Sequence, residues 1–157
     1  MNTASNRFAA RDWAEHHSGL ARWAYWATTG LAALAFAFGG LADVMRAPDV
    51  REGLAHLGYP MYFAAILGVW KLLGATAIVA PGLPRLKEWA YAGMFFDLTG
   101  AAASHAAVGD PAANILTPLL VLVIVVASWV LRPESRSLAS GEPSARPTSD
   151  ARAVAAT

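Results

Sequence analysis

The chain has 157 residues, of which 56% are hydrophobic and 15% are charged, and its mean hydropathy is +0.40. This composition predicts an integral membrane protein with one domain and excludes a soluble enzyme of two domains. The formal net charge of +1 and the scattered positions of Lys and Arg argue against nucleic-acid binding. Without cysteine, the chain cannot exchange disulfides or hold an iron–sulfur cluster or a covalent haem, so a redox role would need a borrowed cofactor.

Four apolar stretches follow a polar N-terminal tail of residues 1–22, and each is long enough to cross a membrane. The first is too long for a signal peptide, so we expect it to remain in the protein. Short connections after the second and third stretches force antiparallel neighbours. The predicted fold is therefore an all-α membrane domain over residues 23–131, an up-down-up-down four-helix bundle. Its expected spans are residues 23–42, 61–80, 89–108 and 115–131.

Two segments outside the spans have their own patterns. The first connection, residues 43–60, carries apolar residues at helical spacing between a proline that suits a first turn and a glycine that suits a helix end. These residues are Pro48, Val50, Leu54, Leu57 and Gly58. We expect a short interfacial helix there. After the last span, residues 132–157 have almost no large apolar side chain and are rich in Ser, Pro, Ala and Arg, which predicts a disordered C-terminal tail.

The distribution of positive charge predicts the orientation. Nine Lys and Arg residues lie in the N-terminal tail, the second loop and the C-terminal tail, against Arg46 and Arg51 on the other side. By the positive-inside rule, both termini then lie in the cytoplasm. We expect a multi-pass protein of the inner (plasma) membrane, surrounded by the lipid bilayer.

Lys71 and Asp97 fall near the middle of the second and third spans. A lone charge at that depth costs at least about 2.5–3.5 kcal/mol, so we expect the two side chains to pair. Each lies on a stripe of small residues, which favours close helix packing, and Ser104 shares the face of Asp97. One interpretation is a structural ion pair that sets helix register. The other is an intramembrane site that binds a ligand or handles protons, where a quinone or another lipophile enters from the bilayer.

A second polar group is expected near the outer surface. It consists of Asp43, His56, His105 and Asp110. Two histidines and two aspartates could hold a metal, but no pair has the spacing of ligands on one helix, so we expect histidine–carboxylate hydrogen bonds and no metal. A b-type haem is not expected either, because no other span supplies a second axial histidine to partner His105.

Several stretches resemble the DoxX-like membrane family. They are FAFGGLAD at residues 36–43, GVWKLLGA at 68–75, LKEWAYAG at 86–93, and ASH at 103–105 followed by GD at 109–110. The resemblance covers residues 22–131 and implies the fold described above. It marks the polar positions Lys71, Glu88, Asp97, Ser104, His105 and Asp110, without assigning a role to any of them. Asp43 departs from the pattern, since many relatives carry a lysine there, and Lys71 departs from the acidic residue common in DoxX proteins proper.

The resemblance implies two functions from different classes. Members of the wider group are membrane subunits of quinone-dependent redox complexes, so the first hypothesis is an accessory subunit that uses Lys71 and Asp97, with redox-complex subunits as partners and quinone as a cofactor. More distant relatives assemble or traffic membrane proteins, so the second is a non-catalytic scaffold or assembly factor in which the pair is structural. A third hypothesis is the transport of a small molecule. Four spans alone are too few to enclose a pathway, so a transporter would need to be a homo-oligomer. No motif assigns catalytic residues, so enzymatic activity stays undecided.

Overall fold

The structure is a computed structural model that describes the backbone of residues 3–133 and the side chains of residues 19–133. The described residues form five helices and no strand, so the predicted all-α class is confirmed. The helices are α1 (Thr3–Met45), α2 (Pro48–His56), α3 (Tyr62–Val79), α4 (Pro84–Ala107) and α5 (Ala112–Val130). From residue 134 on, the predicted C-terminal tail lies outside the described residues.

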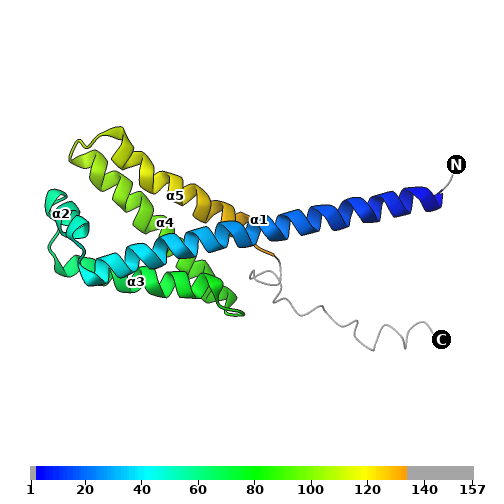
Figure 1. Cartoon of the computed structure of the whole chain (residues 1–157), viewed down its shortest axis with the longest axis horizontal. Helices are drawn as coiled ribbons and strands as arrows, with labels where there is room; N and C mark the ends of the chain where they lie inside the picture. Colours follow the sequence, from blue (N-terminus) through cyan, green and yellow to red (C-terminus); the bar gives the residue numbers. More distant parts are fainter. Residues whose placement is uncertain (1–2, 134–157) are drawn as a thin grey trace, which may run out of the picture.

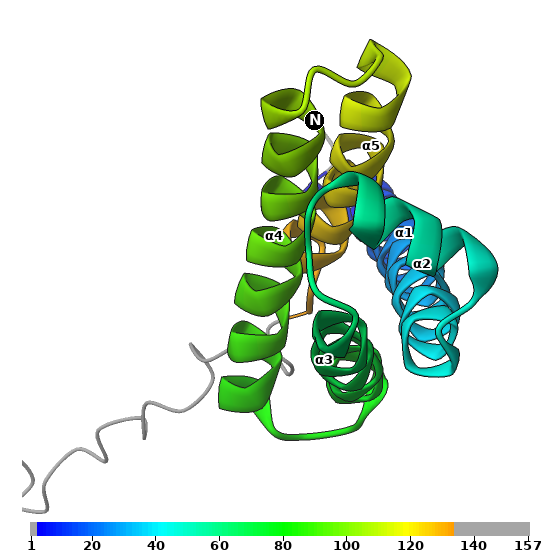
Figure 2. The same cartoon turned by 90° about the vertical axis from the view of Figure 1, so that its left-hand side faces the viewer.

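The four long helices pack in a ring in which consecutive helices reverse direction (Figure 1). α1 packs against α3 and α5, and α4 packs against the same two helices. Figure 2 shows α1 and α3 nearly end-on and α4 from the side, with α2 lying across the end of α1. α1 begins well before residue 23 and continues beyond the other helices at its N-terminal end (Figure 1).

The closest approach in the ring is between α1 and α3. A Cβ atom on Gly68 would lie 2.7 Å from the carbonyl oxygen of Gly40, and one on Gly40 would lie 2.9 Å from that of Gly68. Only glycine at both positions lets the two backbones come this near. The small-residue stripe on α4 behaves differently, because Gly93 and Gly100 are exposed. The stripe predicted to pack is therefore a packing surface on α3 but not on α4.

The turn between α3 and α4 is held by a buried lysine. Gly82 has a φ of 67°, which glycine adopts without strain, and Pro84 begins α4. Lys87, which is fully buried, donates hydrogen bonds to the carbonyl oxygens of Ala77 and Ile78 at 3.0 and 3.1 Å, and also to that of Ala80. These carbonyls belong to the C-terminal end of α3, where no intrahelical donor remains and a cation is favoured.

Three helices in the described part of the chain are long and apolar enough to cross a membrane: Gly19–Met45, Tyr62–Val79 and Ala112–Val130. They correspond to the first, second and fourth expected spans. The third expected span corresponds to α4, which is long enough, with 24 residues, but is not among these three helices. It is less apolar because it contains Asp97, Ser104 and His105. No residue of α2 is buried.

Candidate functional site

Lys71 lies between two carboxylates that come from different helices. Its Nζ atom donates a hydrogen bond to Oδ2 of Asp43 at 2.9 Å and lies 3.8 Å from Oδ2 of Asp97. Asp97, the expected partner, is therefore an ion-pair neighbour, while Asp43 is the hydrogen-bond partner. We expected Asp43 in the outer polar group, but the antiparallel packing of α1 on α3 places it on Lys71. The result is a cluster of one lysine and two aspartates, Lys71, Asp43 and Asp97, which we call the Lys71 cluster.

The Lys71 cluster is largely removed from solvent. The side chains of Lys71, Asp43 and Asp97 are 22%, 11% and 19% exposed. Charges in such surroundings interact more strongly than on a protein surface, and each needs a partner. Because one lysine faces two carboxylates, one negative charge of the cluster is not balanced by a lysine when all three groups are ionised.

An elongated cleft of about 630 Å³ begins at this cluster and runs between α3 and α4. Along α3 it is lined from Leu67 to Ala80, a length of about 20 Å at the rise of an α-helix. Among the described residues that line it, only Lys71 and Asp97 carry charge. Trp70 and Trp89 also line the cleft and are 69% and 80% exposed, so they form an aromatic rim open to the surroundings.

Ser104 lies apart from the Lys71 cluster. Its hydroxyl donates to the carbonyl oxygen of Gly100 at 2.8 Å and shares a hydrogen bond of 2.9 Å with the hydroxyl of Tyr59, which follows α2. Although it shares the α4 face of Asp97 in the sequence pattern, it is nearly two helical turns further along. Ser104 thus joins α4 to the α2–α3 connection.

Three members of the expected outer polar group meet at Asp110, in the loop between α4 and α5. His56 Nε2, from the last residue of α2, lies 2.7 Å from Oδ1, and His105 Nδ1, from α4, lies 2.6 Å from Oδ2. The hydrogen bonds from His105 and then His56 lower the pKa of Asp110 below its usual value, against a smaller opposing effect of burial. In the described residues, no group of histidines and acids has the arrangement of a metal site.

The sequence of the chain matches the DoxX-like family over residues 27–128. The match begins within α1, includes all of α3 and α4 and most of α5, and contains every residue of the Lys71 cluster. The chain belongs to the DoxX-like family. The predicted resemblance is thereby confirmed, and with its apolar helices the chain is a membrane protein. Among curated proteins and solved structures, no match to the chain is found.

The DoxX-like chain also contains a buried polar network that the sequence analysis missed. The hydroxyl of Ser128 on α5 lies 2.6 Å from that of Thr29 on α1 and 2.7 Å from that of Tyr91 on α4. All three residues are buried. The hydroxyl-bearing residues within these helices could have predicted the network, because a buried hydroxyl group needs a hydrogen-bond partner.

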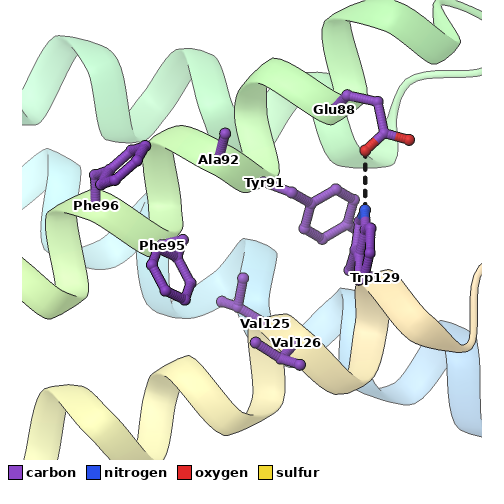
Figure 3. A pocket seen from close by; sticks show the side chains of 8 residues that line it. All are labelled: Glu88, Tyr91, Ala92, Phe95, Phe96, Val125, Val126 and Trp129. Atoms are coloured by element: carbon purple, nitrogen blue, oxygen red, sulfur yellow. Dashed lines mark hydrogen bonds between the residues drawn. The ribbon is translucent and has the colours of Figure 1, made fainter.

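Beside this network, a second and smaller groove of about 430 Å³ lies between α4 and α5 of the DoxX-like chain (Figure 3). Phe95 and Val126 are among the apolar residues that line it. At one end, Glu88 accepts hydrogen bonds from the indole of Trp129 at 2.9 Å and from Arg132. Burial raises the pKa of Glu88, but these two hydrogen bonds and the charge of Arg132 outweigh it, so the pKa is lowered. Glu88, which the resemblance marked, thus joins α4 to the end of α5.

Proposed function

We propose that this DoxX-like protein is an accessory subunit of a quinone-linked membrane redox complex, and that the cleft between α3 and α4 binds the quinone. The observation that carries the proposal is the placement of Lys71 and Asp97 at one end of an apolar cleft. Polar intramembrane residues that face a cavity commonly mark a ligand or proton site. In this proposal the redox centre belongs to partner subunits, and this chain binds the quinone.

The chain crosses the plasma membrane four times in this proposal, with both termini in the cytoplasm. α4 supports a fourth crossing because its 24 residues extend about 36 Å, more than the roughly 30 Å of the hydrocarbon core. It also packs against two apolar helices, α3 and α5. α2, which has no buried residue, lies on the outer membrane surface.

The cleft suits a flat aromatic headgroup with an apolar tail. Its volume of about 630 Å³ lies within the range of roughly 300–1,000 Å³ typical of small-molecule sites. The ammonium group of Lys71 still has N–H groups beyond the one bound to Asp43, and one of them can donate to a ligand oxygen. The exposed rim at Trp70 and Trp89 lets a lipophile enter directly from the bilayer.

A scaffold or assembly factor is the second candidate, and one observation favours it. The hydrogen bond between Lys71 and Asp43 lies beside the tight contact of Gly40 and Gly68, where a Cβ on Gly40 would also come within 2.9 Å of Cβ of Lys71. The pair therefore fixes the register of α1 on α3 whether or not a ligand binds. In this case the cleft would hold ordinary lipid.

Native mass spectrometry of the protein, purified gently from its own membrane, tests the proposal. We expect a co-purifying quinone and stoichiometric partner subunits. The variant Gly93→Leu should lose the quinone, because Gly93 lines the cleft and a Cβ atom added there meets no other atom within 4 Å, so the leucine side chain has room to occupy the cleft. Gly100→Leu is the matched control, since Gly100 lies on the same helix, has equal space and does not line the cleft. Partner subunits without any quinone in the wild type would favour the scaffold.

A further inference from the structure

We propose that the cleft selects the reduced ligand, a hydroquinol, and that Asp97 accepts the hydrogen bond from its hydroxyl group. This inference rests on the proposed function, and it names the form of the ligand that binds. It follows from three features of the Lys71 cluster: which carboxylate is already hydrogen-bonded, how the charges balance, and which groups face the cleft.

Asp43 and Asp97 differ in their hydrogen bonds. Asp43 receives the N–H of Lys71 at 2.9 Å, whereas Asp97 lies 3.8 Å from the same nitrogen, beyond hydrogen-bond distance. Within the described part of the chain, no side chain or backbone group donates a hydrogen bond to the carboxylate of Asp97. Its acceptor capacity is therefore free.

The charges of the cluster point the same way. Lys71 balances one of the two carboxylates, and an uncompensated carboxylate at membrane depth is unfavourable. A ligand that donates a hydrogen bond stabilises this charge, whereas a ligand that offers only lone pairs does not. The site thus has more need of a donor than of an acceptor.

The position of Asp97 makes this acceptor available to a ligand. Asp97 lines the cleft, while Asp43 does not. Thr76, a polar residue of the cleft wall, already donates to the carbonyl oxygen of Leu72 at 2.8 Å in its own helix. Among the described residues of the wall, Asp97 is accordingly the carboxylate that a bound headgroup meets.

The two redox forms of a quinone differ in this property. A quinone has two carbonyl oxygens and only accepts hydrogen bonds, whereas a hydroquinol has two hydroxyl groups that also donate. A hydroquinol can donate to Asp97 and accept from Lys71 at the same time. The O–H bond stays intact in this complex, so binding involves no electron or proton transfer.

Isothermal titration of the protein in nanodiscs, under anaerobic conditions, tests the inference. The ligands are a decyl-substituted benzohydroquinol, the corresponding quinone and the hydroquinol dimethyl ether, and empty nanodiscs correct for partition into lipid. We expect the hydroquinol to bind at least about tenfold more tightly than the other two, the effect of one hydrogen bond to a charged group. The dimethyl ether has the same ring and tail without a donor, so it isolates the hydroxyl.

The variant Asp97→Asn should remove most of this preference, since it replaces the carboxylate by a neutral amide of similar shape. Glu88→Gln is the matched control, because it makes the same change on the same helix outside the cleft. Equal or tighter binding of the quinone would overturn the inference and leave the proposed function standing. Binding of none of the three ligands above the level of empty nanodiscs would overturn both.

Discussion

Lys71 of α3 is hydrogen-bonded to Asp43 of α1, 28 residues earlier in the chain, rather than to Asp97 of α4. The two aspartates therefore have different roles. Asp43 holds Lys71 and joins α1 to α3, and Asp97 faces the cleft with its acceptor free. A single cluster can therefore stabilise the fold and still offer a group to a ligand.

The Lys71–Asp43 pair should behave as a structural contact. Breaking a buried pair so that a charge is left unpaired costs about 3–5 kcal/mol. Lys71→Met leaves both carboxylates of the cluster without a cation, and partial exposure here reduces the expected loss to about 2 kcal/mol. The exchange Lys71→Asp with Asp43→Lys should recover part of that loss, because it restores opposite charges. Thermal unfolding in detergent measures both, and a double variant no more stable than the singles would contradict this assignment.

The contact between α1 and α3 should not tolerate a side chain. Gly68→Ala places a methyl group 2.7 Å from the Gly40 carbonyl and from a methyl of Val44, so we expect a loss of about 1–3 kcal/mol from overpacking. Gly100→Ala is the control, because nothing lies within 4 Å of the added atom, and alanine favours a helix by up to about 1 kcal/mol. The melting temperatures of the two variants should move in opposite directions, and a shift in the same direction would argue against the close approach.

Lys87 should stabilise the protein by capping the C-terminal end of α3. Lys87→Met keeps most of the side-chain volume but leaves the carbonyls of Ala77 and Ile78 without their donor. Each buried group left unpaired costs about 1–3 kcal/mol, so a clear loss of thermal stability is expected. Arg85→Met, at an exposed position of the same turn, should change stability little. Equal effects of the two variants would show that the loss of positive charge matters more than the cap.

The contribution of Asp110 to the stability of the fold should decrease at acidic pH. Its pKa is lowered in the folded protein, so its ionised form stabilises the fold fully above the unfolded pKa of about 3.9. That stabilisation is lost as the pH falls through the lower folded pKa. The difference in melting temperature between wild type and Asp110→Asn should therefore shrink as the pH falls below about 4. A difference that does not shrink in this acidic range would contradict this.

Local features of the sequence were enough to predict most of the helices. Long apolar stretches placed α1, α3 and α5, and the glycine and proline residues around Pro81 and Gly109 placed the turns, because helix formation and chain reversal depend on neighbouring residues. The location of Lys71 and Asp97 near the middle of their helices could be read in the same way. Family membership was also visible in short motifs.

The partners of the polar side chains depended on the tertiary structure. Asp43 pairs with Lys71 because the contact of Gly40 and Gly68 sets the stagger of α1 on α3, and that stagger is not encoded in either helix alone. Ser128 meets Thr29, 99 residues away, for a similar reason. Spacing along the chain thus determined which residues share a helix face, while helix packing decided which of those faces met and which lined the cleft.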